Sequence, residues 1–254
     1  MSTPHSPVSP VIDPDPIPGP DTEHDPLLLL ASASAGRRAT LRAARIEHSA
    51  MPVDLDEDAI LSAARARASE SGDPGDLLTA EEEVLLLARE KALAATARSE
   101  GGYVVLGCDS MLELDGEMIG KPLTAERARE RWLSMRGRTA VLHSGHWIVD
   151  DRDEEDGGTG ATFGASASCQ ITFAQLSDDE IDAYVATGEP LGVAGGFTID
   201  GLGGPFVERV DGDPHAVVGL SLPLLRTMLD DIGLGIHQLW AQVPADDPVG
   251  PGTT

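Results

Sequence analysis

Lysine is nearly absent from this chain of 254 residues, which has two, Lys91 and Lys121, against sixteen arginines. Where a positive charge only has to keep a surface soluble, this sequence uses arginine. A retained lysine therefore indicates a need for a compact ammonium group. Biased codon usage with two surviving lysines accounts for the same counts, so the residues around each lysine have to separate the two interpretations.

Basic residues of either kind are few, and the formal net charge is −25. Nucleic acids and anionic membranes require a basic surface, so we expect neither as a partner, whereas small anions remain compatible where basic groups converge. The two cysteines, Cys108 and Cys169, are too few for a disulfide framework and lack metal-site spacing. Since the chain also lacks a long apolar run and a basic leader, we expect a cytoplasmic protein.

Aromatic residues make up only 4% of the chain, so the core is expected to be aliphatic. Residues 1–26 hold eight of the eighteen prolines and five acids without a lysine or arginine, which predicts a disordered tail. The stretch 241–254 predicts a loose C-terminal tail for the same reason. One domain is expected over 27–240, in which 150–160, with six acids around Arg152, forms a long solvated hairpin loop.

Strand-like and helix-like segments alternate between the tails, which predicts an α/β fold with one mixed sheet flanked by helices. Capping boxes at Thr79 with Glu82 and at Ser177 with Glu180 predict two helix starts. Further helices are expected at 124–136 and 221–233. Short apolar runs predict strands at 27–31, 103–108, 141–149, 206–210 and over much of 162–176.

The first candidate site is the segment in which an apolar run gives way to Ser32, Ser34 and Arg37. A buried strand that leads through small hydroxyl residues into a helix start offers an anion free backbone N–H groups, outward-pointing hydroxyls and a guanidinium. Small residues at such a turn are equally compatible with tight packing, but the arginine favours the anion site.

Lys91 is the second candidate because it lies among Val84, Leu87 and Ala95 on one face of a predicted helix. An ammonium group on an apolar face costs desolvation free energy unless it reaches solvent or meets an anion. A snorkelling lysine is the simpler interpretation. The scarcity of lysine in the whole chain favours a ligand.

Asp109 is the third candidate and our choice for the catalytic carboxylate. It follows directly on a predicted buried strand, the position at which open α/β sheets bind their ligands. The Asp115–Gly116 pair predicts a tight hairpin that returns Lys121 to the neighbourhood of Asp109. A turn or cap residue is the alternative for Asp109.

Two further groups are weaker candidates. The acids Asp54, Asp56, Glu57 and Asp58 could ligate a hard cation, or they could simply begin a helix, where its dipole favours acids. Residues 188–204 contain seven glycines, which permit close backbone approach to a ligand. Within that segment Asp200 is a candidate for contacting a base or sugar edge.

In order and spacing, these segments resemble the Maf family of nucleoside triphosphate pyrophosphatases over roughly residues 27–239. The resemblance is carried by Ser-x-Ser followed by Arg37, the acidic pair Asp56-Glu57, Arg-Glu-Lys91-Ala, Gly-Cys-Asp109-Ser, Asp-Gly-Glu, Gly-Lys121-Pro, Gly-Glu-Pro through Gly-Leu-Gly-Gly, and Val-Val-Gly-Leu-Ser-Leu-Pro. It implies a Maf/ITPase-like fold with a cleft between two lobes.

Two departures from the family pattern concern the substrate. Ala35 and Gly36 stand where the family has Pro-Arg, so one loop arginine is missing or displaced, with Arg38 as the available replacement. The glycine-rich stretch carries Asp200 where the branch associated with dTTP and UTP has glutamine. It is more similar to the branch that prefers 7-methyl-GTP. A carboxylate only accepts hydrogen bonds, so base preference is expected to differ.

The resemblance implies hydrolysis of modified or non-standard nucleoside triphosphates between the α and β phosphates, giving a monophosphate and pyrophosphate. It further implies Mg²⁺ or Mn²⁺ held by Glu57 and Asp109, with Asp109 as general base, and a homodimer. Ser32, Ser34, Arg37, Lys91 and Lys121 would bind the phosphates. The alternatives are a catalytically weak nucleotide-binding regulator of septum formation and a plain metal-dependent phosphatase.

Overall fold

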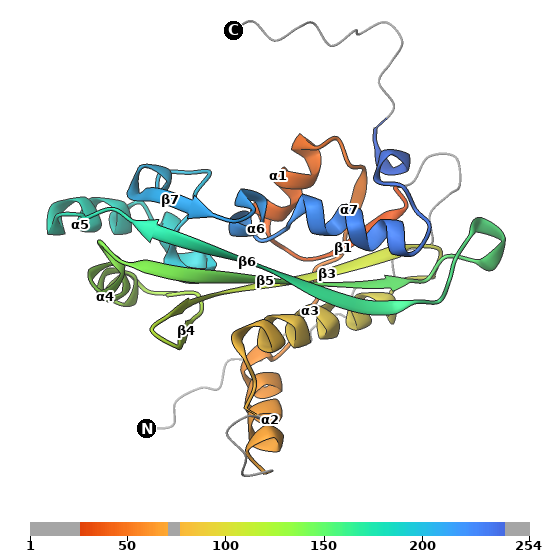
Figure 1. Ribbon diagram of the computed structural model, residues 1–254, viewed down its shortest axis with the longest axis horizontal. Helices are drawn as coiled ribbons and strands as arrows, with labels where there is room; N and C mark the ends of the chain where they lie inside the picture. The colour runs from red at the N-terminus through yellow and green to blue at the C-terminus, as the bar shows by residue number, and fades with distance from the viewer. Residues whose placement is uncertain (1–25, 71–76, 242–254) are drawn as a thin grey trace, which may run out of the picture.

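The structure of the protein is a computed structural model that describes residues 26–70 and 77–241. The tails predicted at 1–26 and 241–254 lie outside the described residues, apart from Pro26 and Ala241. Within the described ranges seven strands form one sheet, in the order β2-β1-β3-β5-β6-β7, with β4 pairing to β3 (Figure 1). The strands are β1 (Leu28–Ala31), β2 (His48–Ala50), β3 (Val104–Leu114), β4 (Glu117–Ile119), β5 (Thr139–Asp150), β6 (Thr162–Phe173) and β7 (Val207–Asp211).

The sheet is mixed, as expected, because β1 pairs in parallel with β2 and β3 whereas the remaining pairs are antiparallel. Helices cover both of its faces: α3 lies on one, and α1, α6 and α7 lie on the other (Figure 1). The helices are α1 (Ala35–Ala43), α2 (Glu57–Ser69), α3 (Ala80–Thr96), α4 (Ala125–Met135), α5 (Asp178–Ala186), α6 (Pro214–Val218) and α7 (Leu222–Asp231).

Local sequence signals account for most helix starts. Both predicted capping boxes are present, at Thr79 with Glu82 and at Ser177 with Glu180. Thr124 and Ser221 cap α4 and α7 through their side chains. Two short elements, β2 and α6, are present without having been predicted.

Helix α3 lies unusually close to the sheet because glycines face it. A Cβ added at Gly107 of β3 would come within 2.0 Å of the Ala88 carbonyl oxygen, and one at Gly145 of β5 within 2.5 Å of the Val84 carbonyl oxygen. Gly145 is also the cross-strand partner of Asp109. The two glycines therefore let the helix backbone approach the strand that carries the proposed catalytic carboxylate.

Strand β3 is longer than predicted, and this corrects the position of Asp109. The apolar run stops at Cys108, but β3 continues to Leu114 because β5 pairs with it along almost its whole length. Asp109 consequently lies inside the strand and not after its end.

The opening at Asp109 comes from the neighbouring strands on the other edge of β3. Pairing with β1 ends at Gly107, and pairing with β4 begins at Leu112. Among the residues that the structure describes, no strand therefore pairs with residues 108–111 of β3 on that edge, and we call this interval the sheet gap. Because β1 is parallel to β3 and β4 antiparallel to it, both strands run towards the gap, and the residues that follow them are delivered to it.

The acidic segment 150–160 connects β5 to β6 as a hairpin, as predicted, but it is only partly solvated. Asp150 is fully buried, with bonds from the Arg152 guanidinium to both of its oxygens and from the backbone and hydroxyl of Thr159. These bonds hold the pKa of Asp150 below its usual range in spite of burial. The start of the loop is therefore a buried ion pair.

Candidate functional site

The Lys91 ammonium pairs with two carboxylates, the buried Asp109 and the partly exposed Glu57. The Lys91 Nζ lies 2.5 Å from Asp109 Oδ1 and 2.7 Å from Glu57 Oε1, and the lysine side chain is only 12% exposed. A snorkelling lysine would extend its ammonium into solvent, whereas the Lys91 ammonium stays inside and contacts carboxylates. Three of the predicted site residues, from α3, β3 and the start of α2, meet at one point.

Burial dominates the protonation of Asp109. It raises the pKa of this carboxyl, while the positive charges of Lys91 and Arg37 oppose the shift and the charge of Glu57 adds to it. A carboxylate with raised proton affinity is suited to accept a proton from water. Burial likewise raises the pKa of the adjacent Cys108 thiol to about 11, so this thiol stays protonated and is not a nucleophile.

The acids before α2 divide between the two predicted interpretations. Asp56 caps the helix by accepting a hydrogen bond of 2.9 Å from the Ala59 amide, as the helix-start interpretation expects. Glu57 instead reaches the Lys91 ammonium. Asp54 and Asp58 are exposed and make no ion pair within the described residues. Glu57 is thus the one member of this group that belongs to the site.

Arg37 is buried on the opposite face of β3, where neutral groups hold its guanidinium. Its Nε donates to the Gly219 carbonyl at 2.9 Å, Nη1 to Ser32 Oγ at 3.0 Å and Nη2 to Ser110 Oγ at 3.2 Å. No carboxylate pairs with it in the part of the chain that the structure describes. Two of its five N–H donors, one on each terminal nitrogen, make no hydrogen bond within the described residues.

The hydroxyls of Ser32 and Ser34 turn inward, and this corrects the expectation that they point outward. Ser32 Oγ accepts from Arg37 and from the Ser34 amide, the latter at 3.2 Å. Ser34 caps α1 by accepting from the Arg37 amide at 3.3 Å. Both serines shape the turn and hold the arginine. The suggested substitute Arg38 has a buried Nε without a hydrogen-bond partner among the described residues.

A chain of buried polar groups that the sequence reasoning missed lies behind Arg37. Ser110 and Ser144 hydroxyls are 2.8 Å apart, and Ser144 donates to the Ala216 carbonyl at 2.8 Å. His146 Nε2 accepts from the Ser221 amide at 2.9 Å, so its Nδ1 carries the proton and donates to the Ser144 carbonyl at 3.1 Å. The available signal was a serine and two histidines inside the otherwise apolar run 141–149.

His146 is neutral in this environment. Burial is the main cause that lowers its pKa, to about 4, and the nearby Arg37 charge adds to the effect. The neutral imidazole therefore bonds to Ser144 and Ser221 without adding a second positive charge near Arg37.

Lys121 is brought to the edge of the sheet gap but touches no carboxylate. The hairpin predicted at Asp115–Gly116 is present, with φ of 55° and 82°, and β4 pairs Ile119 with Leu112. Lys121 follows two residues later and is exposed, without an ion pair or hydrogen bond of its side chain among the described residues. It approaches the neighbourhood of Asp109 through the register and not through a direct contact.

Asp200 is exposed on a loop that Glu189 organises. The Glu189 carboxylate accepts from the Tyr184 and Thr198 hydroxyls and from the amides of Leu202 and Gly203, which holds its pKa low against burial. No contact joins Asp200 to the Asp109 cluster in the described ranges.

The glycine-rich stretch nevertheless packs beside the gap. A Cβ at Gly195 would lie 2.9 Å from the Leu112 side chain, and one at Gly196 3.0 Å from Pro122. This stretch therefore packs against Leu112 of β3 and against Pro122, the residue after Lys121.

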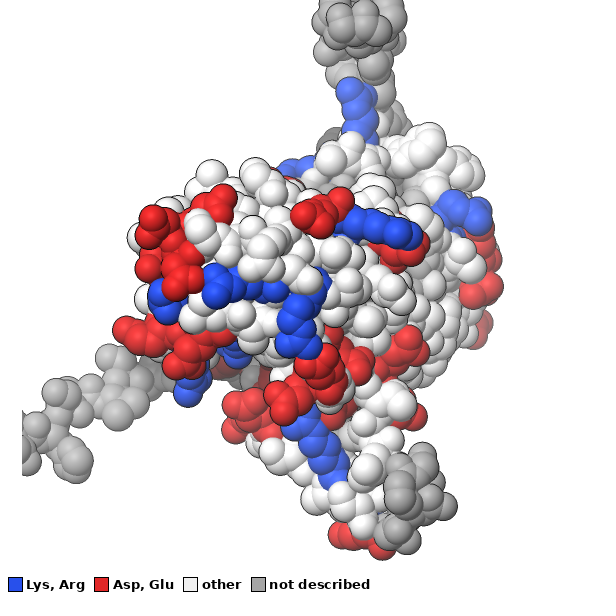
Figure 2. All heavy atoms as spheres, turned by 60° about the vertical axis from the view of Figure 1, so that its left-hand side comes forward, with Lys and Arg blue, Asp and Glu red and all other residues white. Residues whose placement is uncertain are grey.

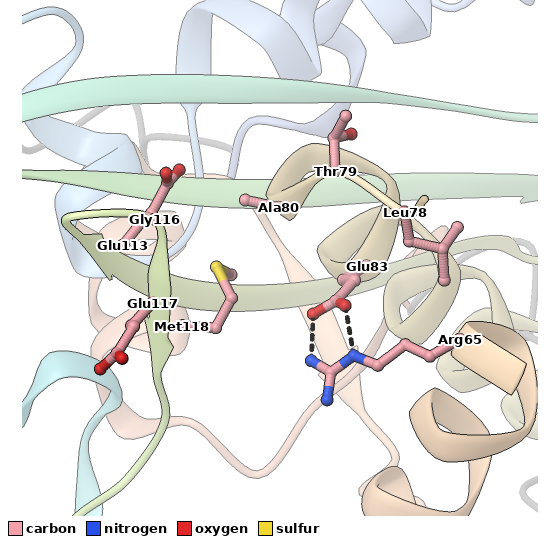
Figure 3. A pocket seen from close by; sticks show the side chains of 9 residues that line it. All are labelled: Arg65, Leu78, Thr79, Ala80, Glu83, Glu113, Gly116, Glu117 and Met118. Atoms are coloured by element: carbon pink, nitrogen blue, oxygen red, sulfur yellow. Dashed lines mark hydrogen bonds and ion pairs between the residues drawn. The ribbon is translucent and has the colours of Figure 1, made fainter. Parts of the chain in front are cut away.

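A cavity of about 750 Å³ opens between residues of α2 and α3 on one side and the β3–β4 hairpin on the other (Figure 3). Across it Arg65 Nε lies 2.5 Å from Glu83 Oε1. Arg65 lies eight residues after Glu57 in α2, and Glu83 lies eight residues before Lys91 in α3, so two ion pairs join these helices. The cavity is lined by Arg65, Leu78, Thr79, Ala80, Glu83, Glu113, Gly116, Glu117 and Met118.

Comparison with known proteins identifies the family. The family described as "Maf-like protein" matches residues 27–232. The chain belongs to the Maf-like family. Its relatives include proteins named nucleoside triphosphate pyrophosphatase from Salinispora tropica, 48% identical over 231 residues that cover 89% of this chain and 92% of the relative, and from Leifsonia xyli, 48% identical over 216 residues that cover 84% and 96%.

A more distant Maf-like relative with the same name, from Mycobacterium ulcerans, is 41% identical over 229 residues, covering 85% of this chain and 98% of its own length. In the described part of this chain no helix is long and apolar enough to cross a membrane. Nor do these residues contain a group of three or more His, Cys, Asp or Glu side chains that could hold a metal ion by themselves.

Proposed function

We propose that this Maf-like protein is a nucleoside triphosphate pyrophosphatase that hydrolyses its substrate between the α and β phosphates. The observation that carries the proposal is the sheet gap, where a buried carboxylate with raised proton affinity, Asp109, lies between the ammonium of Lys91 on one face and the guanidinium of Arg37 on the other. The names of the relatives support the same activity.

In this reaction Asp109 takes a proton from the water that attacks the α-phosphorus. The bond from that phosphorus to the bridging oxygen breaks, and pyrophosphate leaves with the bond's electron pair. Arg37, Lys91 and Lys121 stabilise the charge on the non-bridging and leaving oxygens, which is the main contribution of proteins to phosphoryl transfer. Ser32 and Ser34 act by fixing Arg37 and the start of α1.

The donor set fits a divalent metal of the Mg²⁺ or Mn²⁺ type. Two carboxylates, Glu57 and Asp109, converge on one ammonium, and magnesium sites commonly use one or two carboxylates, with water and substrate phosphates completing the shell. When bound, the metal would neutralise phosphate charge, while Lys91 would turn from the carboxylates to the substrate.

Asp200 is proposed as the base-contacting residue, with a preference for bases that present hydrogen-bond donors, because a carboxylate only accepts. Location in the cytoplasm and assembly as a homodimer stay predictions. Nothing at the site favours a catalytically weak regulator, since the carboxylate, the ammonium and one loop guanidinium are all in place.

A nucleotide panel tests the proposal. The protein is incubated with standard and N7-methylated or otherwise modified triphosphates, with Mg²⁺, with Mn²⁺ and with neither, and both pyrophosphate and orthophosphate are measured. Pyrophosphate released in equal amount to the monophosphate is expected. Orthophosphate alone would indicate a plain phosphatase, and no product from any nucleotide would leave only a binding protein.

A further inference from the structure

Helix α4 carries two arginines, Arg127 and Arg131, that make no ion pair within the described residues and lie near Lys121. The chain has 43 acidic residues against 18 basic ones, and within the described regions eight of the sixteen arginines pair with a carboxylate within 3.0 Å, whereas the other eight make no ion pair. Arg127 and Arg131 make none within these regions, and neither does Lys121. What distinguishes these three cations from the other unpaired ones is that Arg131 contacts the backbone next to Lys121, with Arg127 one helical turn away, and this grouping suggests that an external anion pairs with them.

Arg131 contacts the backbone that leads from β4 to the sheet gap. Its Nη1 donates to the carbonyl of Gly120, the first residue after β4 leaves its pairing with β3 and the residue before Lys121. A carbonyl beyond the end of a strand needs a donor, and Arg131 supplies it. The guanidinium of Arg131 therefore lies beside the backbone that carries Lys121.

Arg127 lies one helical turn before Arg131 and has the same charge. Like charges four residues apart on a helix destabilise it. The pKa of Arg131 is lowered, first by partial burial and then by the charge of Arg127, and no carboxylate offsets either cause. A bound anion would remove the repulsion.

Arg129, between them on the same helix, faces the other way. Its guanidinium pairs with Asp182 at 2.5 Å and with Asp178 at 3.5 Å. The helix thus presents a compensated arginine to α5 and two uncompensated ones elsewhere. Figure 2 turns the side of the molecule that carries α4 and α5 towards the viewer, and on this face basic and acidic side chains lie next to one another.

We propose that Arg131, with Arg127 one turn before it, forms a polyphosphate-binding arm that receives the distal phosphates of the substrate, and then the leaving pyrophosphate, beside Lys121. The inference rests on the proposed function and extends it. Arg37 approaches the gap from the β1 side, and the arm approaches it from the β4 side. A triphosphate laid across the gap would then meet a guanidinium at each end, and a guanidinium can bind two phosphate oxygens at once.

Binding of inorganic tripolyphosphate to the full-length protein, measured by isothermal titration calorimetry, tests the arm without requiring turnover. Arg131→Gln is expected to raise Kd about tenfold, as the loss of one charge-assisted contact would. Arg131→Lys should fall between this variant and the wild type. The matched control is Arg129→Gln, which removes an arginine from the same helix and should change Kd little. Inhibition of turnover by pyrophosphate should follow the same order.

The arm is refuted if Arg131→Gln binds tripolyphosphate as well as Arg129→Gln does, or if the wild type does not bind it. Should Arg131→Gln fail to fold, Arg127→Gln carries the test, because the Arg127 side chain makes no hydrogen bond or ion pair in the described residues, and an unchanged Kd would refute the proposal equally. Arg131-dependent binding in a protein that hydrolyses no nucleotide would support the arm and refute the proposed enzyme.

Discussion

Each face of the sheet holds one cation, Arg37 or Lys91, and the two cations differ in the charge of their partners. On the α1 side, Arg37 is held by two serine hydroxyls and a backbone carbonyl, all neutral, so its charge is fixed in place and not neutralised. On the α3 side, Lys91 is held by two carboxylates that more than cancel its charge. Arg37 and Lys91 thus flank the same strand in different electrostatic states.

Because of this difference in partners, Arg37 is preorganised to bind an anion, whereas Lys91 has to rearrange first. An arginine fixed by neutral partners can bind phosphate oxygens without first breaking an ion pair. Lys91 can turn to a phosphate only when something else satisfies Glu57 and Asp109, which is what a divalent cation would do. Under the proposed function, phosphate binding by Lys91 would therefore be coupled to metal binding, whereas Arg37 would be ready beforehand.

Asp109→Asn should have the largest effect. The amide cannot accept the proton of the attacking water, so kcat is expected to fall about a thousandfold in the pyrophosphate-release assay. The fold should persist because burial already favours a neutral group at this position. Asp115→Asn in the exposed hairpin is the control. A near-normal rate in Asp109→Asn would mean that another group is the base.

Arg37→Lys tests the preorganised side. The charge is retained, but an ammonium cannot hold the three acceptors and present a fork to phosphate, so kcat/KM should fall about a hundredfold. Arg42→Lys, on the exposed last turn of the same helix, should leave the rate unchanged. Equal rates for both variants would show that charge alone suffices at position 37.

Ser144→Ala tests whether the fixation of Arg37 matters. Without this acceptor the Ser110 hydroxyl loses its partner and the guanidinium is held less firmly, so kcat/KM should fall about tenfold. Ser168→Ala removes a hydroxyl on β6 that bonds to Glu81 and should have no such effect. If Ser144→Ala lowers only the melting temperature, the chain of hydroxyls is structural and does not position Arg37.

His146 should have the smallest effect on the rate at neutral pH and a clear one on stability in acid. Between pH 6.5 and about 4 the unfolded chain binds a proton that the folded protein excludes, so the free energy of unfolding decreases as the pH falls through this window. The total loss is about 3 kcal/mol. Urea denaturation at several pH values should show it in the wild type, and His146→Gln should lose less over the same range. Parallel curves would mean that His146 is not held neutral.

The sequence predicted those parts of the site that depend on local signals. The capping boxes begin α3 and α5 where expected, and the Asp115–Gly116 pair forms the hairpin that leads to Lys121. The scarcity of lysine drew attention to Lys91, and the structure places its ammonium between Asp109 and Glu57. Its role in phosphate binding stays a prediction.

Long-range pairing explains what was not predicted. Asp109 and Ser110 look like the end of a strand because they end an apolar run, and only the distant strand β5 makes the backbone continue. The support of Arg37 by Ser144 depends on the same pairing, since Ser110 lies opposite Ser144 across the two strands. Local patterns do not contain this information.

Gly107 and Gly145 carry no charge, yet the packing at both positions leaves no room for a larger side chain. A methyl group at residue 107 would collide with the helix above it and lift that helix away from the strand. Lys91 would rise with its helix, out of reach of its carboxylates. The contact between the Lys91 ammonium and its carboxylates thus depends on two glycines, each with a hydrogen atom where every other amino acid has a Cβ. We expect substitutions at these two uncharged positions to be tolerated as poorly as substitutions of the charged residues.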